Sequence, residues 1–378
     1  SLAGYQGALL APTEILAKQH YESLKGLLKT TSLRVESYYS ALTTAKKQEI
    51  LKRLKEGDID LIVGTHALFQ EGVEFKNLGL AVADEQHRFG VEQRKKLLQK
   101  GSMVDLLLMS ATPIPRTLAN TLYGDMDVST IETMPDGRKQ VKTVLLQENS
   151  FRSVLPEIES QLQEGAQLYV VCGAIEEAQM GEVRTTSKVR EALTKQFKGK
   201  AKVAELHGKM NSDEKEKVMK SFLNNDIQIL VSTTVIEVGV NVVNATSIII
   251  YDAHRFGLSQ LHQLRGRVQR GNKQGNCYLL TDAKEPLSLQ RLKIVEEETD
   301  GFKIAWEDLK MRGPGDLLGT RQSGLPAFLL GNLVEDTAII ETSKKDAAEI
   351  LNNMDEKENQ EIIQEILELR DIVAFAID

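Results

Sequence analysis

Cysteine, tryptophan and long apolar runs are all scarce in this sequence of 378 residues. The two cysteines, Cys172 and Cys277, are too few for a disulfide framework and too far apart for a Cys-x-x-Cys zinc site. No apolar run approaches the ~18 residues of a membrane-spanning helix, and no basic segment followed by an apolar stretch opens the chain. These absences argue against a disulfide-rich secreted protein and predict a cytoplasmic one that does not enter a membrane.

Excess charge is small and unevenly placed. The chain has 54 acidic and 47 basic side chains, which gives a net charge of −7. Residues 333 to 378 alone contain 13 acidic and 4 basic side chains, so this tail is acidic and the rest of the chain is close to neutral. Because a near-neutral total can hide a basic groove, composition by itself leaves a nucleic-acid partner open.

Two stretches of the chain, residues 58 to 90 and residues 226 to 257, resemble each other. Both contain, in the same order, Asp-Ile, Val-x-Thr, Gly-Val, an Asn, and an Asp shortly before His-Arg-Phe-Gly. We expect Asp252 to be the counterpart of Asp84, with Ala253 in the place of Glu85. An internal repeat of this length predicts two similar domains.

Strand and helix patterns alternate along the chain. Continuous apolar runs at 61 to 65 and 229 to 233 are typical of strands buried on both faces of a parallel sheet. Helical patterns cover 14 to 28, 43 to 55 and 212 to 222, and the last opens with a capping pair, Asn211 or Ser212 before Glu214. The fold class is therefore α/β, with two tandem parallel-sheet lobes.

Breaks in these patterns suggest the domain boundaries. Pro135 and Gly137 interrupt both periodicities between the two lobes, and a mainly helical region follows the second lobe. The predicted domains are residues 1–137, 138–285 and 286–378.

Two carboxylates, Asp84 and Glu85, follow the apolar run at 80 to 83. In an α/β sheet the ligand crevice lies at the carboxyl ends of the strands. Asp84 is a candidate ligand of Mg²⁺, which prefers oxygen, and Glu85 is a candidate base that polarises an attacking water. A solvated acidic turn is the alternative.

A basic cluster at 263 to 270, Gln-Leu-Arg-Gly-Arg-Val-Gln-Arg, lies in the second lobe. The planar guanidinium group of arginine suits a transferring phosphoryl group. An ordinary basic surface loop is the alternative.

Taken in order, these segments resemble the superfamily 2 helicases and translocases, whose two RecA-like lobes clamp ATP between them. The matching segments are ALLAPTEILAKQH at 8–20 (motif Ia), VGTHAL at 63–68 (Ib), DEQH at 84–87 (II), SAT at 110–112 (III), HGKM at 207–210 (IV), STTVIEVGV at 232–240 (V) and QLRGRVQR at 263–270 (VI).

The finer resemblance is to the RecG family of branched-DNA translocases. DEQHRFGVEQR, SATPIPRTLA and HRFGLSQLHQLRGRV match that family almost word for word. Residues 301–324 are similar to a helical-hairpin motif that RecG shares with the transcription-repair coupling factor, and Gln86 with the GTRQSG segment favours RecG. The resemblance implies ATP and Mg²⁺ as cofactors, branched or duplex DNA as the partner, and a monomer.

The resemblance also implies roles for single residues. Those implied at the ATP site are Asp84 (metal), Glu85, Gln86, His87, Gly239, Asn241, Gln263, Arg267 and Arg270. Those implied at DNA are Thr13, Thr65, His66, Thr112, Thr233, Arg312, Arg321 and Gln322. For each threonine the alternative is a strand-end hydroxyl that bonds its own backbone.

The sequence departs from the family in one large feature. It has no Gly-x-x-x-x-Gly-Lys-Ser/Thr, the loop that cradles phosphates. We expect that loop upstream of Ser1, a first lobe that is incomplete, and negligible ATP hydrolysis by this chain alone, because positioning is most of phosphoryl-transfer catalysis. We also expect the loss of a central strand from the first sheet to expose two strand edges, with either local disorder there or another segment covering the gap.

Three single residues depart as well: Asn241 and Val243 stand where the family has Asp and Pro, and Gln269 where it has Gly. A DNA- or protein-binding module that has lost catalysis is therefore the alternative function. The coupling factor is a third possibility, which would differ by engaging RNA polymerase.

Overall fold

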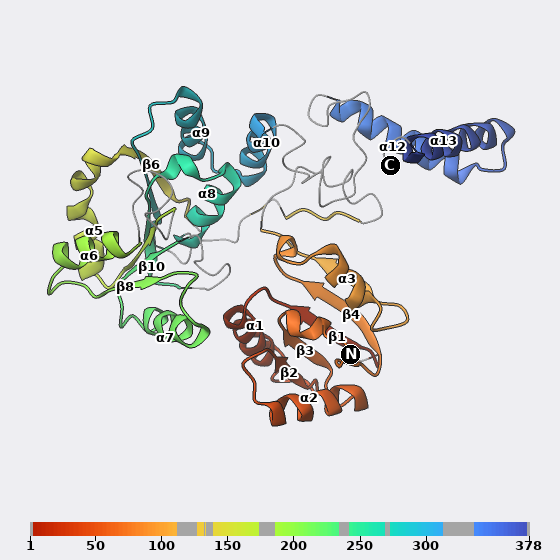
Figure 1. Cartoon of the computed structure of the whole chain (residues 1–378), viewed down its shortest axis with the longest axis horizontal. Coiled ribbons are helices and arrows are strands. Elements are labelled where there is room, and N and C mark those ends of the chain that lie inside the picture. Colours follow the sequence, from red (N-terminus) through yellow and green to blue (C-terminus); the bar gives the residue numbers. More distant parts are fainter. Residues whose placement is uncertain are drawn as a thin grey trace. The chain divides into compact units, whose positions relative to one another are not determined.

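The computed structural model describes residues 3–111, 127–131, 133, 139–173, 186–233, 242–268, 273–312 and 336–375. The chain divides into two compact units, the first containing both β-sheets and the second the C-terminal helices from residue 302 onward (Figure 1). No helix within the described ranges is long and apolar enough to cross a membrane.

The first sheet has five parallel strands in the order β2-β3-β1-β4-β5. Its two long helices match the predicted ones to within one residue at each end. The elements are β1 (Gln6–Leu10), α1 (Glu14–Leu27), β2 (Val35–Tyr38), α2 (Thr44–Glu56), β3 (Leu61–Gly64), η1 (His66–Phe69), β4 (Leu78–Ala83), η2 (Gln86–Arg88), α3 (Val91–Leu98) and β5 (Asp105–Leu108).

The second sheet has six parallel strands in the order β6-β11-β10-β7-β9-β8. Its elements are β6 (Lys142–Gln147), η3 (Glu148–Ser153), α5 (Leu155–Gln163), β7 (Gln167–Val171), α6 (Thr186–Gln196), β8 (Val203–Leu206), α7 (Ser212–Leu223), β9 (Ile229–Ser232), β10 (Ala245–Ile250), η4 (Ala253–Arg255), α8 (Leu258–Arg265), η5 (Gly266–Val268) and β11 (Asn276–Thr281). The predicted capping pair at the start of α7 is Asn211 with Glu214.

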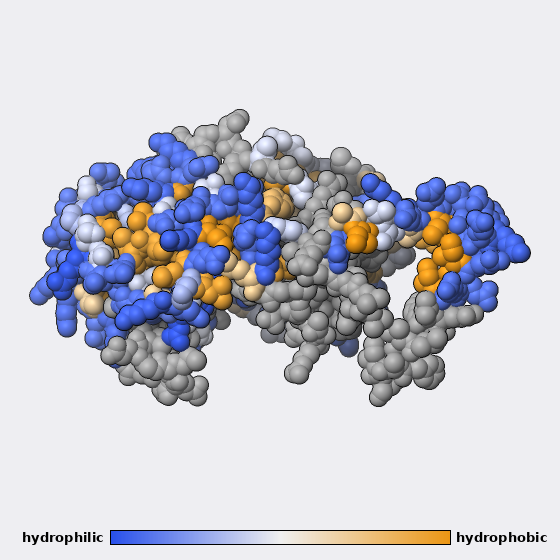
Figure 2. All heavy atoms as spheres, turned by 90° about the horizontal axis from the view of Figure 1, so that it is seen from above, coloured by the Kyte–Doolittle hydropathy of each residue, from blue (hydrophilic) through white to orange (hydrophobic). Residues whose placement is uncertain are grey.

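Helices follow the second sheet: α9 (Pro286–Glu297), α10 (Gly301–Arg312), α12 (Thr337–Asn352) and α13 (Lys357–Phe375). Side chains of α12 and α13 that remain exposed include Ile339, Leu351, Ile366 and Leu367. Figure 2 shows hydrophobic residues among hydrophilic ones on one face of the molecule. The predicted fold class is confirmed: α/β, with two tandem parallel sheets followed by C-terminal helices.

The prediction that the first sheet has lost a central strand is wrong. β1 pairs with β3 on one side and with β4 on the other, and β4 pairs with β5, so the five strands are continuous. Among the residues that the structure describes, β5 is an edge strand of this sheet, whereas its counterpart in the second sheet, β11, pairs with the additional strand β6. The unpaired edge of the described first sheet is therefore at β5, and the hydrogen-bonded ladders between its five strands are uninterrupted.

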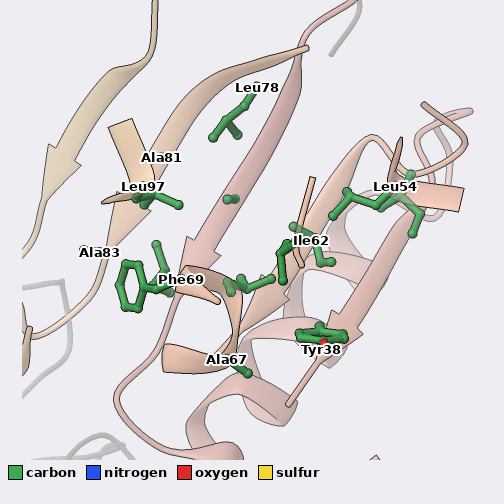
Figure 3. Close-up of a cluster of buried hydrophobic side chains, with 14 of the residues drawn as sticks. Tyr38, Leu54, Ile62, Ala67, Phe69, Leu78, Ala81, Ala83 and Leu97 are labelled. Atoms are coloured by element: carbon green, nitrogen blue, oxygen red, sulfur yellow. The ribbon is translucent and has the colours of Figure 1, made fainter. Parts of the chain in front are cut away.

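Alternating side chains of the first sheet face two different helical layers. Ile62 and Ala81 pack with residues of α2, α3 and η1, such as Leu54, Leu97 and Phe69 (Figure 3). The next side chains along β1 and β3, Leu9 and Val63, pack with Leu16 and Ala17 of α1 on the opposite face. On that α1 face, Leu80 of β4 and Leu107 of β5 are exposed by 43% and 51%. The α1 face is therefore incompletely covered over β4 and β5.

A buried glutamine opens the equivalent strand of each sheet. The Gln6 side-chain amide donates to the carbonyls of Leu54 at 3.0 Å and Ile59 at 2.7 Å, where α2 runs into β3. The Gln167 amide donates to the corresponding carbonyls of Phe222 at 2.5 Å and Ile227 at 2.7 Å. This matched pair of buried contacts supports the internal repeat seen in the sequence.

Replacing Gln6 with Ala is expected to lower the free energy of unfolding by about 2 kcal/mol, because buried carbonyls lose a donor. Urea unfolding followed by circular dichroism measures the change. Gln70→Ala, at an exposed glutamine, is the control and should change stability by less than ~0.5 kcal/mol. Equal midpoints for the two variants would show that the Gln6 contacts do not stabilise this lobe.

Candidate functional site

The two carboxylates lie where β4 ends, between the ends of its neighbours. The backbone N–H of Asp84 donates to the carbonyl of Leu10 at the end of β1, at 3.0 Å. The N–H of Gln86 donates to the carbonyl of Met109, just after β5, at 2.9 Å. These two bonds hold the turn at the carboxyl edge of the sheet, as predicted from the strand pattern.

Glu85 adopts a left-handed backbone conformation with φ 52° and ψ 56°. This conformation is uncommon for a residue other than glycine and costs on the order of 1 kcal/mol or more. The Glu85 N–H donates to the Asp84 carboxylate at 2.9 Å, and the Glu85 side chain is only 6% exposed. The turn thus buries the second carboxylate while the first, with its side chain 21% exposed, stays accessible.

Asp84 has a side-chain partner that the sequence analysis did not assign to the site. His20 Nε2 lies 3.0 Å from Asp84 Oδ2, and because an ionised carboxylate only accepts, the ring N–H donates. His20 lies on α1, four residues after Leu16 and three after Ala17, both of which pack on the sheet. That helical spacing places His20 on the side of α1 that faces the sheet. It is the signal in the sequence from which His20 could have been assigned to the site.

The donor set at the end of β4 fits a hydrated Mg²⁺. Mg²⁺ keeps several waters and binds proteins through one or two carboxylates together with substrate phosphates, so it needs no all-protein cage. Within the described residues no group of three or more His, Cys, Asp or Glu side chains forms a metal cage. Asp84, with an accessible carboxylate beside the buried Glu85, supplies what such an ion would require.

The structure corrects the predicted pairing between the two repeats. Asp252 has φ 50° and precedes the short helix η4, just as Glu85 precedes η2 with φ 52°. The N–H of Tyr251 donates to Val171 at the end of β7, as the N–H of Asp84 donates to Leu10. Asp252 is therefore the counterpart of Glu85, and the counterpart of Asp84 is Tyr251. The prediction paired identical residues, whereas the strand register pairs equivalent positions.

The threonines predicted to face DNA differ in their surroundings. Thr13 caps α1, where its hydroxyl oxygen accepts from the N–H of Leu16 at 3.3 Å. Thr65 and Thr233 follow the equivalent strands β3 and β9 and are 2% and 4% exposed. Their hydroxyls have no hydrogen-bond partner among the described residues. His66, the first residue of η1, is exposed.

The basic cluster of the second lobe begins on α8 and continues into η5. Gln263 lies on α8, and Arg267 lies on η5 with 9% exposure. Arg265, which was not assigned a role, is buried and donates to the carbonyls of Val295 at 2.7 Å and Glu298 at 2.8 Å. Arg265 therefore ties this segment to the end of α9.

Other predicted site residues lie outside the described part of the chain: Thr112, Gly239, Asn241, Arg270, Arg321 and Gln322. His87 belongs to η2 and Arg312 is the last residue of α10, and their side chains are likewise outside the description. Gln86, the first residue of η2, is partly buried.

Three family models match successive parts of the chain. They are DEAD/DEAH box helicase at residues 1–121, helicase conserved C-terminal domain at 151–272, and ATP-dependent DNA helicase RecG, domain 3, C-terminal, at 298–376. Their order agrees with the order of motifs in the sequence.

Curated relatives cover nearly the whole chain. It is 51% identical to the ATP-dependent DNA helicase RecG of Bacillus subtilis over 350 residues, 93% of this chain and 51% of that protein. It is 52% identical to the RecG of Streptococcus pneumoniae over 348 residues, 92% of this chain and 52% of that protein. The chain thus spans about half the length of these relatives.

Solved structures agree with the sequence matches. RecG bound to a three-way DNA junction aligns with a TM-score of 0.72 and 41% identity, covering 89% of this chain and 44% of that one. Dbp5 of S. cerevisiae bound to RNA and ADP BeF3 aligns with a TM-score of 0.57 and 18% identity, covering 81% of each chain, which indicates a shared fold. The two sheets are therefore tandem RecA-like lobes.

Helix α8, which carries Arg265, also contains a histidine with a shifted pKa, His262. Burial, followed by the neighbouring positive charge of Arg265, lowers the pKa of His262 to about 4. His262 Nδ1 accepts a hydrogen bond from Arg265 at 2.8 Å, which requires a neutral ring. The unfolded chain takes up this proton near the ordinary value of 6.5, before the folded chain does.

The free energy of unfolding should therefore fall as pH drops from about 6.5 to about 4, by at most roughly 3 kcal/mol from this group. Urea unfolding at intervals across that range measures the slope. His262→Asn keeps an acceptor near the Nδ1 position but cannot titrate, so its slope should be shallower. Superimposable curves for the two proteins would contradict the assignment.

Proposed function

Because the chain belongs to the RecG family of ATP-dependent DNA helicases, we propose that it is the motor region of an enzyme that uses ATP hydrolysis to move on branched DNA. The observation that carries the proposal is the match to RecG bound to a three-way junction, at 41% identity over 89% of this chain. The placement of Asp84 and Glu85 at the carboxyl edge of the first sheet supports it independently. The proposed parts are residues 1–137 and 138–285 as the two lobes and 286–378 as the helical region.

The first lobe would provide the acidic side chains of the ATP site. Asp84 would hold Mg²⁺ through its accessible carboxylate, and the ion supplies neutralisation of phosphate charge when it is bound with ATP. Glu85 would orient the attacking water and accept its proton, which suits a buried carboxylate in a rigid turn. Gln86 and His87, in the next turn, would respond to the state of the nucleotide.

The second lobe would provide the positively charged side chains. Arg267 and Arg270 would neutralise negative charge on the transferring phosphoryl group, with Gln263 beside them. The chain has no Gly-x-x-x-x-Gly-Lys-Ser/Thr, so none of its own segments would cradle the phosphates with backbone amides in that way. Hydrolysis by these residues would require phosphates positioned by another segment.

DNA would be held mainly through its backbone. Thr13 caps α1 just after β1. Thr65 and Thr233 follow β3 and β9 with buried hydroxyls that have no partner among the described residues, so they would reach a phosphate only if the residues that cover them moved. Hydroxyl contacts to phosphate position a duplex without reading its sequence. Arg312 and the residues that follow it would couple lobe movement to the duplex.

Purified as it stands, this chain should release phosphate from ATP at the background rate, with or without DNA. Fusing a segment that contains Gly-x-x-x-x-Gly-Lys-Ser/Thr to the start of the chain should yield ATP turnover that DNA stimulates. In that fusion Glu85→Gln should lower turnover by about 100-fold or more, because the base is lost. Phosphate release is the measurement.

The exposed Glu71 offers a matched control in the same lobe, and Glu71→Gln should leave turnover of the fusion unchanged. If the fusion binds DNA but hydrolyses ATP no faster than its Glu85→Gln variant does, the result would favour the alternative, a binding module without catalysis.

His66→Ala should weaken binding of this chain to a forked DNA duplex by about three- to tenfold. The loss should be equal for duplexes of unrelated base sequence, because an exposed side chain just after β3 would contact only the sugar-phosphate backbone of the DNA. Fluorescence anisotropy at several salt concentrations measures the affinity. Lys52→Ala, which removes an exposed charge from α2, is the control for a general electrostatic effect. An equal loss for both variants would place the DNA elsewhere.

A further inference from the structure

The hydrogen bond between His20 and Asp84 joins two segments far apart in the sequence. His20 lies in the second turn of α1, and Asp84 follows β4. The two side chains are 27% and 21% exposed, and Nε2 and Oδ2 lie 3.0 Å apart. The contact is therefore partly shielded from water, which strengthens a hydrogen bond to a charged acceptor relative to one in open water.

The Asp84 carboxylate is fixed at both of its oxygens. Oδ1 accepts from the backbone N–H of Glu85 at 2.9 Å, and Oδ2 accepts from His20. Each carboxylate oxygen has about two acceptor positions, so one on each remains for a metal ion or a metal-bound water. Two donors from different elements leave the carboxylate plane little freedom to rotate.

The fold alone does not demand this polar pair. At the equivalent position of the second lobe stands Tyr251, which is 5% exposed and packs edge-on against Phe151 in the hydrophobic core. The backbone bond of Tyr251 to Val171 is the same as that of Asp84 to Leu10. One backbone frame thus accepts a core aromatic residue in one lobe and a carboxylate bonded to histidine in the other.

The histidine also connects the carboxylate to the start of α1. Thr13 caps that helix, and His20 follows it by seven residues, about 10 Å along the axis. Leu16 and Ala17, between them, are 2% and 0% exposed and pack on the sheet. A helix anchored in this way moves as one body, so a displacement at its first turn would carry His20 with it.

We infer that His20 is a positioning residue: it holds the Asp84 carboxylate in the orientation that binds Mg²⁺ and ties that orientation to helix α1. This inference rests on the proposed function, because it requires Asp84 to be the metal-binding carboxylate. Hydrogen-bond partners of metal ligands typically contribute a factor of 10 to 100 to metal affinity.

Binding of Mn²⁺ alone, followed by the loss of the free-ion electron paramagnetic resonance signal, tests the inference on this chain without turnover. Asp84→Asn defines the part of the binding that depends on Asp84. Within that part, His20→Ala and His20→Asn should weaken Mn²⁺ binding about tenfold, since an asparagine amide is too short to reach Oδ2.

His20→Gln places an amide N–H near the position of Nε2 and should restore affinity to within about threefold of the unchanged chain. The comparison of Gln with Asn tests the reach of the amide group; because Asn is the poorer helix former, circular dichroism must show that both variants keep the helix content of the unchanged chain. Glu22→Ala, at an exposed site on the same helix, should have no effect.

The outcomes distinguish failure of the proposed metal site at Asp84 from failure of the inference on His20. If Asp84→Asn leaves Mn²⁺ binding unchanged, the proposed metal site fails, and the inference fails with it. If Asp84→Asn abolishes the binding but His20→Asn and His20→Gln both match the unchanged chain, only the inference on His20 is overturned. Equal losses for Asn and Gln would likewise overturn it, because the donor would then not be what matters.

Discussion

The parallel hydrogen-bonded ladder between β1 and β4 is the constraint on which the candidate site depends. It aligns Leu10 with Ala83, so the residues that leave both strands emerge side by side. The N–H of Asp84 extends the ladder by one bond to Leu10, and the chain after Leu10 turns into α1. The geometry of His20, Asp84 and Glu85 follows from that single register, since a slip by one residue would turn the site side chains to the other face.

Duplication of the fold separates the features that both lobes share from those that differ between them. Both lobes keep a buried glutamine at the first position of the equivalent strand and a left-handed residue before a short helix. These shared features satisfy buried carbonyls and make the turn, which any chain of this topology must do. The lobes differ at Asp84 and Tyr251, where one has a charge and the other a core side chain. This difference agrees with the proposed role of the first lobe, which is to supply the acidic side chains of the ATP site.

Buried polar groups of the second lobe anchor the segment that carries its arginines. Arg265 is 4% exposed, and its guanidinium group is satisfied by the carbonyls at the end of α9 and by the neutral ring of His262. A buried guanidinium group without such partners would cost several kcal/mol, so these contacts fix where α8 ends. The position of Arg267, two residues later, is set by that anchor.

The fold class, the alternation of strands and helices and the internal repeat were predictable from the chain alone, because hydrophobic periodicity and capping residues are local. The sequence also identified Asp84 and Glu85, since two carboxylates after an apolar run are visible without a structure. Folding was needed to show that His20 bonds Asp84 and that the strands of the first sheet form one uninterrupted ladder. Each of these depends on strand register and on contacts between segments tens of residues apart. A one-dimensional pattern does not encode them, because the packing of the whole sheet decides which strand ends become neighbours.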